Sequence, residues 1–279
     1  MWAILGGLGA AFFWAVTTLT AARASRLIGS PATLAWVMLT GFVVVAPVAL
    51  AEGKPAALDG GALGWLALAG FGNVAGLLCI YSGFRRGNVG VVAPISSSEG
   101  AVAALIAVAV GEHLGIGTAL ALAAIVVGIV VTARAPVADA DVDPRAALFG
   151  LAGAGAFGAS LYATGRASLD LPIAWAVLPP RLLGVAFVTI PLLAASRLRL
   201  TRDALPLVVA SGLAEVAGFV CYAIGARHGI AIAAVLASQF AAVAVLGAAV
   251  LFKERLGRLG LAGIAVIAVG VAVVSALQA

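Results

Sequence analysis

The stretch NVAGLLCIYSGFRRGNVGVVAPISSSEG, residues 73–100, occurs again later in the chain as EVAGFVCYAIGARHGIAIAAVLASQFAA, residues 215–242. The offset of 142 residues stays constant through both copies and on to Glu112 and its counterpart Glu254. Alanine, glycine and valine coincide by chance in apolar sequence, so the rarer matches carry the weight. These are the two glutamates and the pairs Cys79 with Cys221 and Arg85 with Arg227. The pattern indicates an internal duplication.

The composition is that of an integral membrane protein. Of 279 residues, 64% are hydrophobic and only 10% are charged, whereas ordinary soluble domains carry about 25% charged residues. The mean hydropathy is +1.20. A helix that crosses the roughly 30 Å hydrocarbon layer needs about 20 residues, so the length allows around ten spans. The apolar segments are of helix length and do not alternate like barrel strands, which excludes an outer-membrane barrel.

Charges and Pro/Gly clusters divide the chain into ten apolar segments, each expected to form a transmembrane helix. They cover residues 2–22, 32–51, 63–84, 89–110, 116–133, 146–165, 172–195, 205–226, 230–252 and 259–277. The first segment lacks the positively charged start of a cleavable signal and is interpreted as a span. The expected fold class is therefore all-α, with ten transmembrane helices.

The most polar stretch, APVADADVDPR at residues 135–145, separates two halves. We interpret it as a linker between a first five-helix repeat, residues 1–134, and a second one, residues 146–279. An odd number of crossings inserts the second copy upside down. Inverted repeats of this kind occur in many secondary transporters, whose substrate site lies in a central cavity where the halves meet.

The charges indicate orientation rather than a nucleic-acid partner. The formal net charge is +5, but the basic residues lie singly or in small clusters at span ends, where they contact anionic headgroups. Twelve of them fall in odd-numbered connections and three in even-numbered ones. By the positive-inside rule, the odd-numbered connections face the cytoplasm and both termini lie outside. The two cysteines form no disulfide or metal-binding pattern, and no cofactor is expected.

Each half ends in a similar pattern, VAVGEHLGIGTALALAAIVVGIVV in the first and AVLFKERLGRLGLAGIAVIAVGVAVV in the second. Preceded by an Arg-x-Gly turn, this pattern resembles the EamA repeat of the drug/metabolite transporter (DMT) superfamily over nearly the whole chain. The paired Glu112 and Glu254 are its most specific marks. The resemblance implies a ten-helix inverted repeat with a central cavity, and export of small metabolites such as amino acids by secondary transport.

Two features depart from the family pattern. Relatives typically carry a proline thirteen residues before the helix-end glutamate, where this chain has Glu99 and Ala241. The residue expected to kink the helix is thus replaced, in one repeat by an ionisable group. Relatives are also usually drawn with both termini in the cytoplasm, the opposite of what the charge count gives. The side of the termini therefore stays open.

Three ionisable residues lie deep in apolar segments: Glu99, Arg181 and Glu215. Charge inside a membrane is costly unless it is paired or hydrated, so such residues are functional-site hypotheses. A buried carboxylate can exchange a proton near neutral pH, whereas arginine stays charged and suits a carboxylate. We expect Glu99 and Glu215 to be proton or ammonium sites and Arg181 to bind a substrate carboxylate. The alternative is a structural ion pair between Arg181 and one glutamate, or a glutamate that faces water at the cavity mouth.

A second group of polar and aromatic residues is expected near the cavity, with interhelical hydrogen bonding or core packing as the alternative role. It consists of Asn73, Tyr81, Ser96, Ser97, Ser98, Tyr162, Tyr222, Ser238, Gln239, Trp14 and Trp175. Glu112 and Glu254 lie at helix C-termini, where the helix dipole disfavours an anion, so each needs a compensating partner. We expect both to be structural anchors or gate contacts.

The sequence therefore predicts a multi-pass protein of a bacterial inner membrane that moves a small-molecule substrate by alternating access. Protons are a candidate coupling ion, membrane lipids surround the protein, and it is expected as a monomer or homodimer. No enzyme is expected, because no catalytic cluster, metal-ligand spacing or nucleotide-binding loop occurs. The alternatives are an uncoupled facilitator or channel, and a non-catalytic membrane assembly partner, for example in the translocation of lipid-linked precursors.

Overall fold

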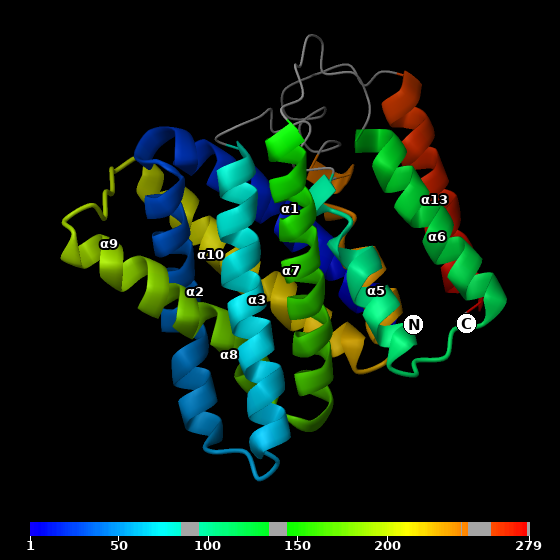
Figure 1. The fold of residues 1–279 in the computed structure, drawn as a ribbon, viewed down its shortest axis with the longest axis horizontal. Helices are drawn as coiled ribbons and strands as arrows, with labels where there is room; N and C mark the ends of the chain where they lie inside the picture. The colour runs from blue at the N-terminus through cyan, green and yellow to red at the C-terminus, as the bar shows by residue number, and fades with distance from the viewer. Residues whose placement is uncertain (85–94, 134–143, 241, 245–257, 278–279) are drawn as a thin grey trace.

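The computed structural model describes residues 1–84, 95–133, 144–240, 242–244 and 258–277, and these form helices and short connections without any strand (Figure 1). The helices of the first half are α1 (Trp2–Ile28), α2 (Ser30–Glu52), α3 (Gly60–Phe84), α5 (Glu99–Ala109) and α6 (Ile116–Ala133). Those of the second half are α7 (Pro144–Asp170), α8 (Ile173–Gly184), the π-helix η1 (Val185–Thr189), α9 (Ile190–Ala194), α10 (Ala204–Ala226), α11 (Ile230–Ala237) and α13 (Arg258–Leu277). The expected all-α class is confirmed.

The first helices are separated by tight glycine turns. α1 is followed by Gly29 with a φ of 86°, and α2 by Gly53 with a φ of 73°. Both values lie in the left-handed region, which glycine adopts without a steric cost. Pro31 stands in the first turn of α2, where its missing N–H breaks no helical hydrogen bond. α2 therefore follows α1 after a single residue.

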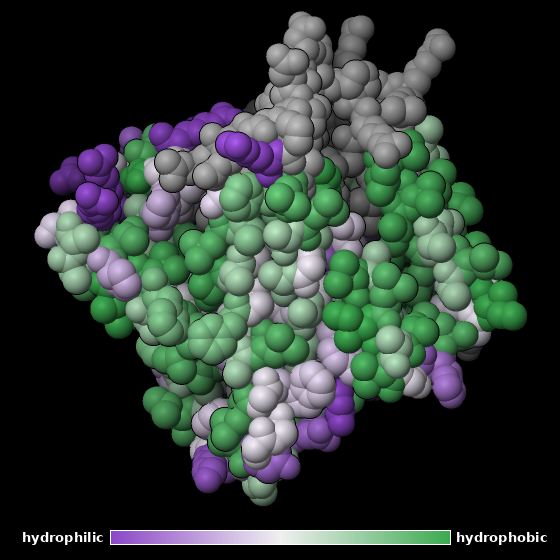
Figure 2. Space-filling view, viewed as in Figure 1, coloured by the Kyte–Doolittle hydropathy of each residue, from purple (hydrophilic) through white to green (hydrophobic). Residues whose placement is uncertain are grey.

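The helices form a surface suited to lipid. Among the described residues, five helical stretches are long and apolar enough to cross a membrane: α1, α2, most of α3, the run from α8 to α9, and α10. Figure 2 shows a broad hydrophobic band between polar ends. Large apolar side chains such as Phe12, Val43 and Phe187 are exposed on these helices. Lipid tails can cover such a surface, and water cannot do so without a free-energy cost. The chain is a multi-pass membrane protein.

The two halves pack against each other in a symmetric scheme. α1 packs along α10, and its counterpart α7 packs along α3. In the same way, α2 contacts α10 and α8 contacts α3. The pairs α2 with α8 and α6 with α13 join corresponding helices directly, whereas α5 and α11, which also contact each other, are opposite halves of two corresponding spans. Apart from the contact of α5 with α11, exchanging the two halves turns each of these contacts into itself or another contact of the set, so the sequence repeat is matched by a repeat in packing.

Glycines allow the closest of these crossings. A Cβ atom at Gly6 of α1 would lie 2.5 Å from the carbonyl oxygen of Cys221 in α10. A Cβ atom at Gly72 of α3 would lie 2.8 Å from the carbonyl oxygen of Ala156 in α7. Both distances are too short for any side chain. Small residues thus let the helix backbones touch, as is common where membrane helices associate.

The predicted segment 172–195 is not one regular helix, because the π-helical turn η1 lies between α8 and α9. Such turns insert one extra residue and are frequent near functional sites. The predicted linker is also shorter at its end, because α7 begins at Pro144. Proline is favoured at the first helical position, so Pro144 and Arg145 are helical residues. The rest of the linker, residues 135–143, lies outside the described residues.

The predicted segments 89–110 and 230–252 are both interrupted near the middle. In the first, residues 97–98 form a turn and α5 begins at Glu99. In the second, α11 ends at Ala237, residues 238–239 form a turn, and the helix resumes at residue 240. The break therefore occurs at corresponding places of both repeats, although neither repeat has the proline that relatives carry thirteen residues before the helix-end glutamate. Residues 89–94, 241 and 245–252 of these segments lie outside the described residues.

Candidate functional site

Arg181 is fully buried and contacts α2 and α10 from its place on α8. Its Nη2 donates a hydrogen bond to the backbone carbonyl of Glu215 at 3.3 Å and lies 3.9 Å from the Oε1 atom of that residue. Its guanidinium carbon lies 4.6 Å from the centre of the Phe219 ring, a cation–π geometry. A Cβ atom at Gly41 of α2 would lie 3.1 Å from the Nε atom. The structure thus pairs Arg181 with one deep glutamate, Glu215.

The hydrogen-bonding capacity of this guanidinium is only partly used. Among the described residues, the Nε and Nη1 atoms of Arg181 are buried without a hydrogen-bond partner. A guanidinium carries five N–H donors in a planar fork, and a buried donor without a partner costs free energy. A bound molecule with acceptor oxygens would satisfy these atoms.

Glu99 reaches the same region from the first half of the chain. It is 5% exposed, and its charge is coupled electrostatically to that of Glu215. As the first residue of α5, it lies at the positive end of the helix dipole, which stabilises a carboxylate. The start of α5 is fixed by close contacts, because Gly100 faces Ser238 and Gly158 faces the carbonyl of Glu99. The three ionisable residues predicted to be functional therefore share one buried region.

Further polar atoms on the surrounding helices are also left unpaired. Within the described parts of the chain, the buried atoms without a hydrogen-bond partner include Nε1 of Trp14, both amide atoms of Asn73 and Nε2 of Gln239. The Oγ1 atom of Thr164 belongs to the same set and was not predicted from the sequence. Buried polar groups in native proteins are normally hydrogen-bonded. Several unpaired groups in one protein core indicate a region that water or a ligand completes.

An aromatic cluster lies next to the charged residues. The ring centre of Trp14 is 5.0 Å from that of Phe219, 6.3 Å from that of Tyr222 and 6.5 Å from that of Phe240. The hydroxyl of Tyr222 donates to the carbonyl of Leu161 at 2.8 Å, which ties α10 to α7. Because Phe219 also contacts Arg181, the aromatic and charged clusters are continuous.

The predicted serines lie at the two helix breaks. Ser96, Ser97 and Ser238 are buried, and Ser98 is half-buried. The hydroxyls of Ser98 and Ser238 each donate to the carbonyl three residues earlier, at 2.7 and 2.9 Å. These bonds satisfy backbone carbonyls where the helices stop. These two hydrogen bonds are thus local to the breaks.

Other predicted residues lie elsewhere or beyond the described part. The Nε1 atom of Trp175 donates to two carbonyls at the end of α2, at 3.1 and 3.0 Å, and so anchors that helix end. Tyr162 packs edge-on against Trp65, with ring centres 5.7 Å apart. The side chain of Tyr81, and Glu254 as a whole, lie outside the described residues.

A cavity of about 320 Å³ lies at the ends of α5, α7 and α10 and the start of α11, and we call it the end cavity. It is lined by Ala107, Val110, Glu112, Tyr162, Arg166, Leu169, Ala226, Arg227, Gly229 and Ile230. Both carboxylate oxygens of Glu112 accept from the backbone N–H of Ala231, at 3.1 and 3.3 Å. The compensating partner that the sequence requires for Glu112 is therefore the N-terminus of α11, in the other half of the chain.

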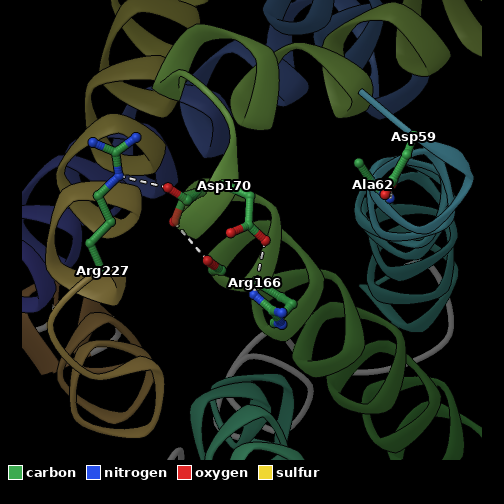
Figure 3. A network of polar contacts seen from close by, with 7 residues as sticks. Asp59, Ala62, Arg166, Asp170 and Arg227 are labelled. Atoms are coloured by element: carbon green, nitrogen blue, oxygen red, sulfur yellow. Dashed lines mark hydrogen bonds and ion pairs between the residues drawn. The ribbon is translucent and has the colours of Figure 1, made fainter. Parts of the chain in front are cut away.

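Arg227 bonds to the end of α7 beside this cavity, where Arg166 and Asp170 of α7 also lie (Figure 3). Arg227 donates from Nε to the carbonyl of Ser168 at 2.6 Å and from Nη2 to the carbonyl of Leu171 at 2.9 Å. A cation at this position also stabilises the negative end of the helix dipole. Arg166 forms an exposed ion pair with Asp170 at 3.2 Å, one helical turn along α7.

Fold and site together define a class: a multi-pass, all-helical membrane protein with an internal repeat and a buried charged cluster between its halves. Residues 1–134 match the model of the EamA-like transporter family. This part of the chain is similar to that family, which is part of the DMT superfamily, in agreement with the sequence resemblance. Members of the family are membrane transporters and not enzymes.

Solved structures agree on the fold. One, described only as "Crystal structure of protein", superposes with a TM-score of 0.79 over 99% of this chain and 96% of the other. The two sequences are 18% identical, so the likeness shows the fold alone. No curated protein sequence matches the chain.

Phe219, Gly41 and Arg227 were not selected as site residues from the sequence. Phe219 follows Glu215 by four residues and so lies on the same helix face, a signal that would have found it. Arg227 was signalled by its repeat partner Arg85. Gly41 carries no such signal, because its role is to leave space for a side chain of a distant segment.

Proposed function

We propose that the chain is a secondary-active transporter of the DMT type that exports small metabolites, amino acids first, from a bacterial cell by alternating access across the inner membrane. Its ten helices form two inverted repeats, residues 1–134 and 146–279, joined by the linker at 135–145. The family match of the first half and the symmetric packing of corresponding helices support this architecture. In inverted-repeat transporters the site lies where the halves meet, which is where Arg181 lies.

The observation that carries the proposal is the guanidinium of Arg181. It is completely buried, yet two of its three nitrogens have no partner in the described structure. Arginine binds carboxylates in a bidentate manner through adjacent N–H groups. We assign it the substrate carboxylate, with Glu215 as the counter-charge when no substrate is bound.

Glu99 and Glu215 are the proposed proton or ammonium sites. With Arg181 they give the buried cluster two acids and one base, so one negative charge is not balanced within it. A proton or a substrate ammonium group would balance that charge, because an unpaired charge in a membrane interior is strongly disfavoured. Trp14, Phe219 and Tyr222 provide aromatic faces that can contact an ammonium group or an apolar side chain.

The test is amino-acid release from cells that are loaded with a mixed pool of dipeptides. Cells expressing the protein are compared with cells expressing Glu215→Gln and with empty-vector cells, with equal membrane expression confirmed. We expect faster release of a few amino acids from the first cells only. Equal release from all three would remove amino acids as the substrate class. Release that the variant retains in full would remove Glu215 from the mechanism.

A further inference from the structure

The end cavity is a second place where the chain presents charge to a small molecule, and it is separate from the Arg181 cluster. It is lined by one acid, Glu112, by two bases, Arg166 and Arg227, and by apolar side chains such as Val110, Leu169 and Ile230. Its volume of about 320 Å³ can hold a molecule the size of an amino acid.

Arg227 has the properties of a fixed anion ligand. Two of its five N–H donors are used, both by backbone carbonyls at the end of α7. These bonds hold the planar group in place and leave its other donors without a partner among the described residues. A guanidinium fixed in this way loses little conformational entropy when it binds a carboxylate. Arg166 is less suited, because Asp170 already pairs with it.

Glu112 lines the same cavity but forms no ion pair with any residue in the described part of the chain. Its oxygens accept only a backbone N–H of α11, and each oxygen has a further lone pair. The cavity thus holds opposite charges that do not neutralise each other directly. A ligand that carries both an ammonium and a carboxylate group would join them.

We propose that the end cavity binds a zwitterionic amino acid with an apolar side chain. Its carboxylate contacts Arg227, its ammonium group contacts Glu112, and its side chain lies against Leu169 and Ile230. The proposal does not depend on a role for Arg181, because none of these contacts involves the buried cluster.

The test is equilibrium binding of tritiated L-leucine to the purified full chain in detergent, measured in an Arg181→Gln background so that the buried cluster cannot bind the carboxylate. We expect saturable binding that is weakened about tenfold or more by Arg227→Gln and by Glu112→Gln, since each loses a charge-assisted hydrogen bond. Leucinamide, which lacks the carboxylate, and 4-methylpentanoate, which lacks the ammonium group, should compete at least tenfold less well than leucine.

Lys54→Gln is the matched control. Lys54 is an exposed basic residue assigned to an even-numbered connection, as Arg166 and Arg227 are, but unlike them it does not line the cavity. Glu112→Gln keeps an acceptor for the N–H of Ala231 and serves if Arg227→Gln fails to fold. If Arg181→Gln fails to fold, the binding is measured without that substitution. Arg227→Gln and Glu112→Gln must then each bind one equivalent of leucine less than the wild-type chain. The proposal would be overturned if no saturable leucine binding were observed. It would also be overturned if the Arg227→Gln and Glu112→Gln proteins bound leucine with the same affinity as the protein without these substitutions. Either result would leave the release experiment on Glu215 unaffected.

Discussion

Arg181 contacts Glu215 and Phe219, and its Nε and Nη1 atoms have no hydrogen-bond partner in the part of the chain that the structure describes. A purely structural ion pair in a membrane interior would use its hydrogen-bonding groups fully, because each unused donor costs free energy. The unpaired Nε and Nη1 atoms therefore favour a binding role over the structural alternative. The two roles can be separated by comparing a variant that lacks only Arg181 with a variant that lacks both charges of the pair.

Arg181→Met should lower the free energy of unfolding by about 3 kcal/mol, because it leaves Glu215 buried without its cation. Adding Glu215→Gln should recover most of that loss, since no buried charge then remains unpaired. Transport should be absent in both variants. Thermal unfolding of the purified proteins and amino-acid release from loaded cells provide the two readouts. A double variant that transports like the wild type would show that the pair is structural only.

Gly41 is predicted to control the position of Arg181. An added methyl group there would come within 3.1 Å of both Cδ and Nε of the arginine and of Cγ2 of Val216. Gly41→Ala should therefore displace the guanidinium and raise the apparent KM for release about tenfold, because a carboxylate contact of this kind contributes about that much. The measurement is initial release rate against internal amino-acid concentration.

Gly155→Ala is the control for this experiment, because a methyl group at Gly155 of α7 meets no atom within 4 Å. It should leave the KM unchanged and stabilise the helix by roughly 0.5–1 kcal/mol. An equal KM in the two variants would show that Gly41 does not position the arginine.

The positions of the helices were the feature of the fold best predicted from the sequence. Apolar segments of span length predicted α2, α3, α6 and α10 to within a few residues at most ends. The breaks before Glu99 and after Ala237 were not predicted, because no cluster of charges, prolines or glycines divides either segment there and both lack the proline that relatives carry thirteen residues before the helix-end glutamate. In each repeat the break lies at polar residues, which are serines in the first repeat and Ser238 with Gln239 in the second. Such side chains compete with the helical backbone for hydrogen bonds.

The site could be predicted only in part, because the sequence shows charges in apolar segments but not the contacts between distant helices. Charge in an apolar segment identifies Glu99, Arg181 and Glu215 wherever they point, since a charge inside a membrane requires a partner or water on any face of its helix. Trp175 is predicted near the cavity with core packing as the alternative, and its observed hydrogen bonds go to the end of α2, because an aromatic residue in an apolar segment is suited to several environments. Gly41 gains its role from a contact between helices that sequence spacing does not encode, whereas Phe219 is signalled by its place four residues after Glu215.

The crossing of α1 and α10 should depend on glycine more than on side-chain packing. A methyl group at Gly6 would lie 2.5 Å from the carbonyl oxygen of Cys221 and from the Cα atom of Gly225. Backbone atoms cannot move aside as side chains can, so Gly6→Ala should destabilise the protein by about 1–3 kcal/mol. The unfolding temperature in detergent measures this. Gly64→Ala in α3, where a methyl group meets open space, should not lower it, and a similar loss in both variants would contradict the prediction.

In the whole molecule, the end cavity lies on the same side of the membrane as the two termini. The N-terminus, the end of α13 and the turn between α2 and α3 lie along the lower side of Figure 1. The end cavity is built from the ends of α5, α7 and α10, which are even-numbered connections like that turn. Its role in transport, as the side of loading or of release, therefore depends on which face of the membrane the termini occupy.

The positive-inside rule gives a definite prediction for that face. Because twelve basic residues lie in odd-numbered connections against three in even-numbered ones, the C-terminus should lie outside the cytoplasm. A C-terminal alkaline phosphatase fusion should then be active, and a C-terminal green fluorescent protein fusion should be dark, with equal expression as the control. In an exporter of this orientation the end cavity receives the substrate after it has passed the Arg181 cluster. A fluorescent fusion with an inactive phosphatase would reverse the orientation, and the same cavity would then be where the substrate enters from the cytoplasm.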